Sequence, residues 1–193
     1  MENKKYHQIL QAARNLFWKY GLKRVSVEEI CREAGVSKMT FYRFFPNKIE
    51  LAKAVFDIAV DEGKQKFLDI LADSTDIQEK IASMIDLKLK STNDISPEFL
   101  MDLYKNPETG LKEHVEKASA ARWNELIRYF RLGQRKGIFR KEIKPEFLLY
   151  YSRKIGEMVT DENLIRLYGS PQHLIRELTT FFVYGVSSRN ELK

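Results

Sequence analysis

The 193-residue sequence is poor in cysteine, histidine and glycine, and each shortage excludes a class of protein. Its single cysteine, Cys31, cannot form an intramolecular disulfide, so stability must come from packing, and we expect a reducing compartment. The three histidines, His7, His114 and His173, lie far apart and lack the spacing of metal-binding motifs. We therefore predict no metal site.

Motifs of the common enzyme classes are missing as well. The chain has no G-x-S-x-G nucleophile turn, no G-x-x-x-x-G-K-[ST] phosphate loop and no G-x-G-x-x-G dinucleotide loop. No motif places a nucleophile beside a base or pairs two carboxylates. We predict that the protein is not an enzyme, has no catalytic site and uses no cofactor.

Long hydrophobic runs are also absent. An apolar stretch such as residues 181–186 is far shorter than the ~20 residues of a membrane-spanning helix. The N-terminal residues lack the apolar core of a secretory signal. We predict a cytoplasmic protein that does not bind membranes.

Positive charge is present in excess, and it is concentrated in the first quarter of the chain. Residues 1–50 contain ten Lys/Arg and five Asp/Glu, whereas the rest of the chain contains 23 and 22, within a net charge of +6. This asymmetry favours a polyanion as the partner of residues 1–50. A basic surface without a nucleic-acid partner is the alternative interpretation of the same composition.

Apolar residues recur at helical spacing throughout, with no alternating strand pattern, so we predict an all-α fold of about nine helices. The first helix ends before Gly21, two short helices follow Ser26 and Ser37, and the others cover residues 47–72, 76–91, 97–105, 108–136, 145–168 and 171–187. The 47–72 helix would be about 39 Å long and could belong to two domains. We predict an N-terminal helix-turn-helix domain of residues 1–50 and a C-terminal helical bundle of residues 51–193.

Cap signals define the two short helices. Ser26 and Glu29 have the spacing of a capping box, Gly35 allows a tight turn, and Ser37 is an N-cap residue for the next helix. Pro46 ends that helix, and Asn47 begins the long one. Two short capped helices preceded by a third are the layout of a helix-turn-helix, whose second helix enters the DNA major groove.

The helix that follows Ser37 has two distinct sides. Phe41 and Phe45 are four residues apart and should face inward, so that Met39 and Arg43 project from the opposite side. We predict that this outer side meets base edges and that nearby hydroxyl and basic groups bind phosphates. The predicted DNA-binding residues are Ser26, Ser37, Lys38, Met39, Thr40, Tyr42, Arg43 and Lys48.

Several of these residues also have a purely structural interpretation. Tyr42 could be a core aromatic, Thr40 a plain helix-surface residue and Arg43 a solvated charge. Cys31 is expected to be a buried small hydrophobe, and His114 a surface residue.

The run Ser26 to Leu51, SVEEICREAGVSKMTFYRFFPNKIEL, resembles the DNA-binding region of the tetracycline-repressor (TetR/AcrR) family over roughly residues 6–56. The A-G-V-S, F-Y, F and K-x-x-L elements carry the similarity. Cys31 stands where the family usually has alanine, and Met39 where a small residue is common. The resemblance implies a helical C-terminal domain with a ligand pocket, dimerisation through the last two helices, and repression of transcription.

Residues 57–193 are rich in aromatic side chains and methionines, which either form a bundle core or line a cavity for a hydrophobic or amphipathic ligand. We select Tyr104, Trp123 and Tyr151 as its polar contacts. The final helix, with Leu174, Leu178, Phe181, Phe182 and Gly185, is too apolar to face solvent fully, so we place a homodimer interface on it and on the helix before it.

Together these observations predict a ligand-responsive repressor that binds a palindromic operator in double-stranded DNA as a homodimer, released by an unidentified small-molecule inducer. A helical adaptor that binds another protein through its basic face, without specific DNA binding, is the alternative.

Overall fold

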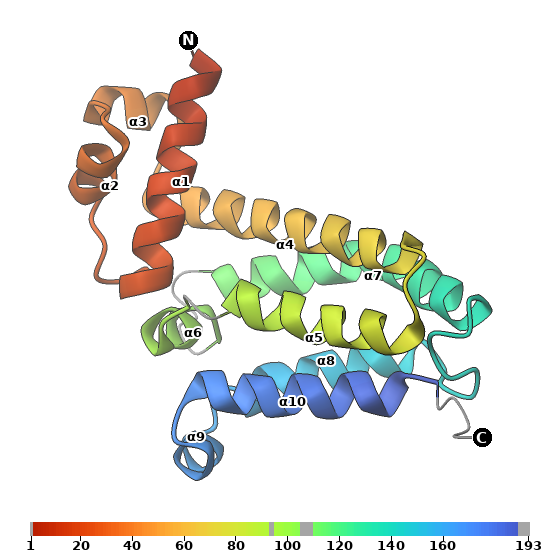
Figure 1. The fold of residues 1–193 in the computed structure, drawn as a ribbon. Coiled ribbons are helices and arrows are strands. Elements are labelled where there is room, and N and C mark those ends of the chain that lie inside the picture. The colour runs from red at the N-terminus through yellow and green to blue at the C-terminus, as the bar shows by residue number, and fades with distance from the viewer. Residues whose placement is uncertain (1, 93–94, 105–109, 189–193) are drawn as a thin grey trace. The chain divides into compact units, whose positions relative to one another are not determined.

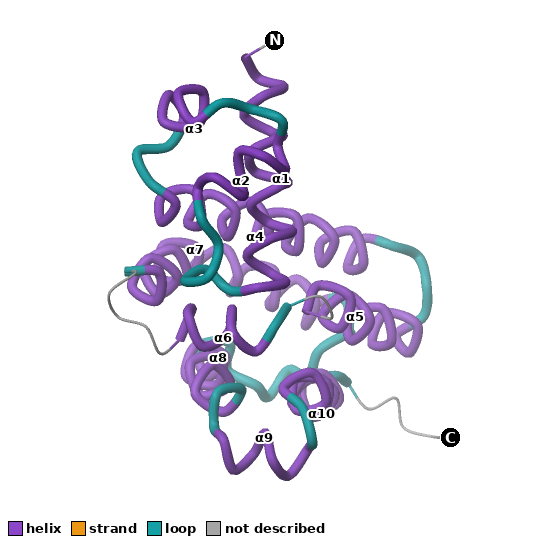
Figure 2. Tube along the Cα trace, turned by 90° about the vertical axis from the view of Figure 1, so that its left-hand side faces the viewer, coloured by secondary structure: helices purple, strands orange, loops and turns teal. Residues whose placement is uncertain are grey.

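A computed structural model of the protein describes residues 2–92, 95–104 and 110–188, and every regular element in these ranges is a helix (Figures 1 and 2). The predicted all-α fold is confirmed. No helix in the described ranges is both long enough and apolar enough to cross a lipid bilayer. The helices are α1 (Glu2–Tyr20), α2 (Val27–Ala34), α3 (Lys38–Phe44), α4 (Lys48–Ala72), α5 (Ile77–Thr92), α6 (Pro97–Tyr104), α7 (Leu111–Arg135), α8 (Phe147–Met158), α9 (Glu162–Tyr168) and α10 (Pro171–Val186).

The helix expected over residues 145–168 is divided in two, which is the main departure from the predicted elements. α8 ends at Met158 and α9 begins at Glu162. Between them, the Asp161 carboxylate accepts hydrogen bonds from the backbone N–H groups of Asn163 and Leu164, at 2.8 and 3.1 Å. This side chain caps a new helix and so ends the continuous apolar spacing that suggested a single one.

The helices pack into two compact units, which we describe separately. The first takes in residues 1–61 and 94–117, and the second residues 62–93 and 118–193. By packing, α6 and the start of α7 therefore belong with the N-terminal helices. The division into functional domains at residues 50 and 51 remains a prediction.

α6 joins the first unit because it packs on the C-terminal end of α1. The Trp18 and Phe99 rings lie 4.7 Å apart, and the Trp18 carbonyl accepts a 2.7 Å hydrogen bond from the Ser96 N–H. Gly21, which follows α1, has φ +78°, and a Cβ there would lie only 3.0 Å from the Cβ of Glu98. Glycine is thus required both for the backbone conformation and for the close approach of α6.

The second unit has its own aromatic core. The Phe139 ring stacks on Phe130 at 4.6 Å and on Phe67 at 6.5 Å, with interplanar angles of 6° and 7°. Leu71 and Ile138 are buried beside this stack. Gly133 of α7 lies directly against the Phe139 ring and leaves no room for a Cβ. Within this unit, α5 and α10 run side by side (Figure 1).

A buried lysine closes the end of α4 in the second unit. The Lys80 ammonium donates hydrogen bonds to the carbonyls of Ile70 and Asp73, at 2.9 and 2.6 Å. These carbonyls lie at the end of α4, where helical partners are missing, so the cation satisfies them and complements the helix dipole. No local sequence pattern indicated this contact, because the two helices are brought together only by the turn between them.

Candidate nucleic-acid interface

The predicted caps of α2 and α3 are present. The Ser26 Oγ accepts from the Glu29 N–H at 3.2 Å, while the Glu29 carboxylate accepts from the Ser26 N–H at 2.8 Å. These hydrogen bonds from Ser26 lower the pKa of the Glu29 carboxyl. Gly35 ends α2 in the left-handed conformation, with φ +63°. The capping box and the glycine turn therefore fix where α3 begins.

Ser37 starts α3 and is linked to Thr40. The Thr40 N–H donates to the Ser37 Oγ at 3.1 Å, and the two hydroxyl oxygens lie 3.0 Å apart. Ser37 is exposed and Thr40 half-buried. The predicted N-cap is confirmed, and it orients both hydroxyl groups near the first turn of α3.

The inner side of α3 is anchored in the core of the first unit. Phe41 is completely buried and Phe45 nearly so. The Tyr6 ring of α1 stacks on Phe45 at 5.4 Å (Figure 1 shows α3 beside the start of α1). Cys31 is buried in the same core as predicted, and burial raises the pKa of its thiol. The predicted inward face of α3 is confirmed.

The outer side of α3 is open to solvent. Met39 is 83% exposed and Tyr42 53% exposed, and Arg43 is exposed as well. The interpretation of Tyr42 as a core aromatic is therefore wrong. The Arg43 guanidinium lies 5.2 Å from the Phe44 ring centroid. A large apolar side chain, a phenol and a guanidinium thus stand together on a surface that the first unit does not cover.

Other basic residues of the first unit are exposed to solvent. Arg24 and Arg32 are exposed, as are Lys4, Lys5 and Lys23. The excess positive charge predicted to meet a polyanion is therefore accessible to one.

Lys38 is held by a carboxylate of the preceding helix. Its ammonium forms an ion pair with Glu28 of α2, which raises the pKa of Lys38 and lowers that of Glu28. Both side chains are exposed. Since an exposed pair is weak and screened by salt, a phosphate can replace the carboxylate as the partner of Lys38.

Lys48 is placed differently from the prediction. Its ammonium donates to three backbone carbonyls, those of Leu22 at 2.8 Å, Lys23 at 3.2 Å and Val25 at 2.8 Å. Partial burial lowers its pKa. An ammonium has three N–H donors, so these carbonyls account for its full capacity. We therefore revise the role of Lys48 from binding phosphate to holding the loop between α1 and α2 against α4.

We expect Lys48→Ala to destabilise the first unit by about 1–3 kcal/mol, because carbonyls that are partly buried would be left without their donor. Thermal or denaturant unfolding measures this effect. Lys53→Ala is the matched control, since Lys53 lies further along α4 and pairs with Glu50 at the surface. Equal stability of the two variants would show that the hydrogen bonds of Lys48 contribute nothing.

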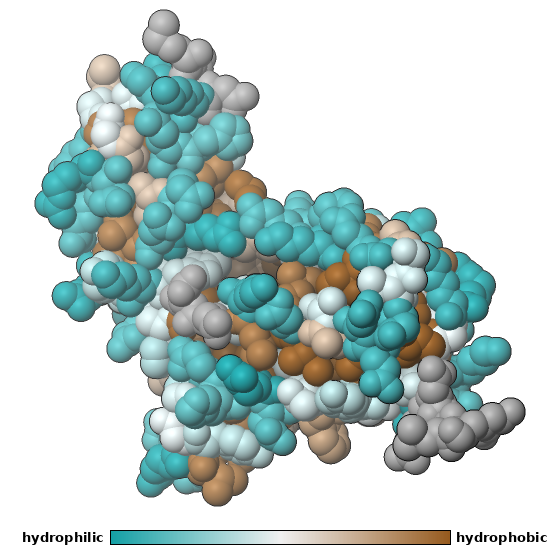
Figure 3. All heavy atoms as spheres, viewed as in Figure 1, coloured by the Kyte–Doolittle hydropathy of each residue, from teal (hydrophilic) through white to brown (hydrophobic). Residues whose placement is uncertain are grey.

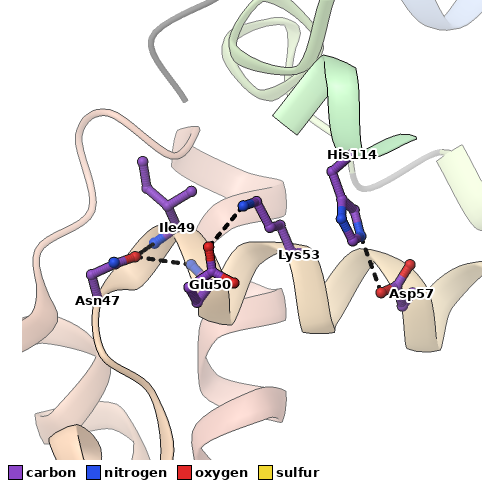
Figure 4. A network of polar contacts seen from close by, with 6 residues as sticks. All are labelled: Asn47, Ile49, Glu50, Lys53, Asp57 and His114. Carbon is purple, nitrogen blue, oxygen red and sulfur yellow. Dashed lines mark hydrogen bonds and ion pairs between the residues drawn. The ribbon is translucent and has the colours of Figure 1, made fainter. Parts of the chain in front are cut away.

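Helix α4 has a cap at its start and, further along, a polar contact with α7 (Figure 4). The Asn47 side-chain oxygen accepts from the N–H groups of Ile49 and Glu50, at 2.9 and 3.0 Å. Further along α4, Asp57 Oδ2 lies 3.1 Å from the Nε2 of His114 in α7. His114 is half-buried, so the expectation of a plain surface residue is wrong. The long sequence separation of Asp57 and His114 hid the pair from sequence reasoning.

Of the three predicted ligand contacts, only Tyr151 has a described side chain; those of Tyr104 and Trp123 lie outside the described residues. Tyr151 is half-buried in the second unit, and its ring stacks on Phe182 of α10 at 4.9 Å. Burial raises the pKa of the Tyr151 phenol. The stacked rings join α8 to α10.

Comparison with known proteins agrees with the geometry of residues 1–61. Residues 9–55 match the family model described as bacterial regulatory proteins, tetR family. This segment contains α2, α3 and the start of α4. Residues 9–55 therefore form a DNA-binding helix-turn-helix of the tetR type, and curated relatives of the chain are named HTH-type transcriptional regulators.

Individual relatives are distant. An uncharacterized HTH-type transcriptional regulator, YfiR, from Bacillus subtilis strain 168 is 24% identical over 151 residues, which cover 75% of this chain and 70% of that protein. The fatty acid degradation regulator FadR of Bacillus halodurans has a similar fold, with TM-score 0.66, 21% identity and coverage of 96% and 97%. A transcriptional regulator from Saccharomonospora viridis in complex with choline has TM-score 0.64 and 19% identity, over 97% of this chain and all of that one.

Proposed function

We propose that this protein is a repressor that binds a palindromic operator as a homodimer and is released from it by a hydrophobic or amphipathic ligand. The observation that carries the proposal is the two-sided recognition helix α3. Its phenylalanines are buried behind it, while 83% of Met39 and 53% of Tyr42 remain exposed beside Arg43. A helix anchored in this way can enter a major groove without disturbing its own core.

The proposed contacts divide by chemistry. Met39, Thr40 and Arg43 meet base edges, where a guanidinium and a hydroxyl read donors and acceptors and an apolar group reads the thymine methyl. Hydroxyl and ammonium groups at the helix starts, together with the Tyr42 phenol, bind phosphates. The proposed phosphate contacts are Ser26, Ser37, Lys38 and Tyr42. Lys48 binds no phosphate in this proposal and instead holds the loop that precedes Ser26.

The proposed dimer interface is formed by α8 and α10. Phe181 and Tyr184 of α10 are 72% and 64% exposed, and Phe147 and Tyr150 of α8 are exposed too. Leu174 and Leu178, predicted for the same interface, are buried within the protomer instead. Exposed aromatic residues in two neighbouring helices are typical of a protein interface. We take the partner to be a second copy, which sets two α3 helices about 34 Å apart, one turn of DNA.

Ligand release requires that the ligand prefer a different arrangement of the dimer. Only differential affinity shifts such an equilibrium, and a change from 99:1 to 1:99 takes about 5.5 kcal/mol. We assign this role to α4, because the chain from Lys48 to Ala72 belongs partly to each unit. The choline complex of the S. viridis regulator supports a ligand site in a protein of this fold.

Selection of bound sequences from random duplexes tests the proposal. We expect enrichment of a palindrome whose half-sites are about 10 base pairs apart, with binding that weakens steeply as salt rises. Enrichment of no sequence, with weak binding to all duplexes, would favour the adaptor. Catalytic turnover abolished by a single carboxylate substitution would instead favour an enzyme.

We expect Thr40→Ala to relax the base preference at one position of each half-site by about 1–3 kcal/mol, while random duplex affinity stays unchanged. Competition binding with single-base variants of the operator measures this. The comparison variant is Lys38→Ala, which should weaken operator and random duplex alike and lower the salt slope by about one for each phosphate that is no longer bound. Similar reductions in affinity on both duplexes in both variants would contradict the division into base and phosphate contacts.

A further inference from the structure

The loop between α1 and α2, residues 21–25, is held by side chains from two other helices of the first unit. The Lys48 ammonium of α4 takes three carbonyls of this loop, that of Lys23 among them. The Asp102 carboxylate of α6 accepts a 3.0 Å hydrogen bond from the Lys23 N–H. Both backbone polar groups of Lys23 are therefore bound, one by a residue of α4 and the other by a residue of α6.

Asp102 is buried, with only 7% of its surface exposed, although it is a charged residue. Polar residues cover most of the visible surface around α1, α2 and α3 (Figure 3), where water competes for hydrogen bonds. The buried carboxylate is shielded from this competition, so its bond to the Lys23 N–H is stronger than an exposed one. A Cβ at Gly21 would lie 3.0 Å from the same carboxylate oxygen, so α6 approaches the loop closely.

The stability of α1 does not explain a carboxylate at this place. The C-terminal end of a helix carries partial negative charge, which disfavours an anion beside it. Stacking of Trp18 on Phe99 and the hydrogen bond between the Trp18 carbonyl and the Ser96 N–H already join α6 to α1. The contact that Asp102 adds is made to the loop.

A cation near Asp102 compensates its charge. Burial lowers the pKa of Lys48, and the carboxylates of Asp102 and Glu29 act on that pKa in the opposite direction. The ammonium thus lies near one carboxylate from α6 and one from α2. Since an anion and a cation hold the same loop, neither charge is buried without an opposite one.

The loop leads directly to the N-cap of α2. Val25, its last residue, is buried and bound to Lys48 through its carbonyl. Ser26 follows immediately and caps α2, and the turn at Gly35 then fixes where α3 begins. A displacement of the loop would therefore move Ser26, which is one of the proposed phosphate contacts.

We propose that Asp102 is a positioning residue for DNA binding, which holds the loop of residues 21–25 from α6 and so sets where Ser26 meets the duplex. This deepens the proposed function, on which it rests, by adding a residue from outside residues 9–55. Asp102 is buried and does not contact DNA itself. The affinity for DNA falls in proportion to the fraction of molecules whose loop keeps the competent position.

Two substitutions of similar size test the hydrogen bond in the full-length protein. Asp102→Asn keeps an oxygen that accepts from the Lys23 N–H and removes the charge, so it should retain binding to the operator selected from random duplexes. Asp102→Leu has no acceptor. It should weaken binding by about 5- to 30-fold, the effect of losing one such hydrogen bond. Operator and random duplex should be affected alike, because a phosphate contact carries no sequence information.

Leu103→Ala is the matched control, because Leu103 is the next residue of α6 and is also buried, but its side chain is apolar. It should lower the midpoint of thermal unfolding and leave the DNA affinity of the folded protein unchanged. All variants are compared at a temperature where circular dichroism finds each of them folded. A decrease in affinity that follows stability alone would therefore be seen in Leu103→Ala as well.

A double-mutant cycle with Ser26→Ala adds a readout that a merely structural role would not move. If Asp102 acts through the position of Ser26, Asp102→Leu should cause little further loss of DNA affinity once the Ser26 hydroxyl is absent. Independent effects would instead multiply the two reductions in affinity.

Four results would overturn the assignment: wild-type affinity in Asp102→Leu, an equal decrease in Leu103→Ala, loss of binding in Asp102→Asn, or independent effects in the cycle. The wild-type protein is the reference for the proposed function. If it binds no specific sequence, the proposed function fails. If it binds the operator and Asp102→Leu binds equally well, only the role of Asp102 fails.

Discussion

The double substitution Phe181→Asp/Tyr184→Asp is expected to separate the homodimer and to reduce affinity for a palindromic duplex by about 10²–10⁴-fold, the gain that linked binding of two sites provides. Both side chains are mostly exposed on α10, so the free protomer should tolerate the change. In the dimer, two carboxylates from each copy would be buried in an aromatic interface without partners. Binding to a single half-site should be unchanged, because α3 is untouched.

Light scattering measures the mass of the assembly, and titration of a full operator against an isolated half-site measures the linkage between the two sites. Leu167→Asp is the matched control, since Leu167 is also strongly exposed but lies on α9, outside the proposed interface. A double variant that still has twice the protomer mass would place the dimer interface elsewhere. A wild-type protein with the mass of one protomer would contradict the dimer altogether.

Phe41→Ala is expected to destabilise the first unit by about 3–5 kcal/mol, the usual cost of truncating a fully buried phenylalanine. Phe41 is completely buried, its ring centroid lies 6.1 Å from that of Phe45, and it joins the inner side of α3 to the core. The decrease is comparable with the whole stability of many small domains. DNA binding should therefore fall with the folded fraction, although the outer side of α3 keeps every proposed contact.

Denaturant unfolding followed by circular dichroism measures the stability, and operator titration on the same samples measures the binding. Met39→Ala serves as the control, because Met39 is 83% exposed on the same helix and should change stability by less than about 0.5 kcal/mol. It should affect operator binding alone. A Phe41→Ala variant with wild-type stability would show that α3 is not held by its inner side.

The elements that could be predicted from the sequence depend on residues close together in the chain. The Ser26–Glu29 box, the Ser37 cap and the inward Phe41 are local, so short-range spacing was enough to place them. The division of the 145–168 segment was missed although its cause, Asp161, is local too. Continuous apolar spacing outweighed a single capping residue in that prediction.

The contacts that sequence reasoning missed join residues that are far apart in the chain. Lys48 has the composition and position of a phosphate contact, but its carbonyl partners lie 23 to 26 residues away. Asp57 and His114 are 57 residues apart, and Asp102 accepts a hydrogen bond from the Lys23 N–H over 79 residues. Polar pairs of this kind have no periodic signature, since only packing brings them together.

The sequence by itself determined the helical class, the caps of α2 and α3, the family and the basic character of residues 1–50, because periodicity, capping and charge act over a few neighbouring residues. Only the tertiary structure decided which lysines are bound to backbone carbonyls. Lys48 and Lys80 donate to backbone carbonyls, whereas Lys90, the same residue type, is exposed and pairs with Asp86. That environment is a property of the packed chain, since desolvation and the supply of acceptors depend on distant segments.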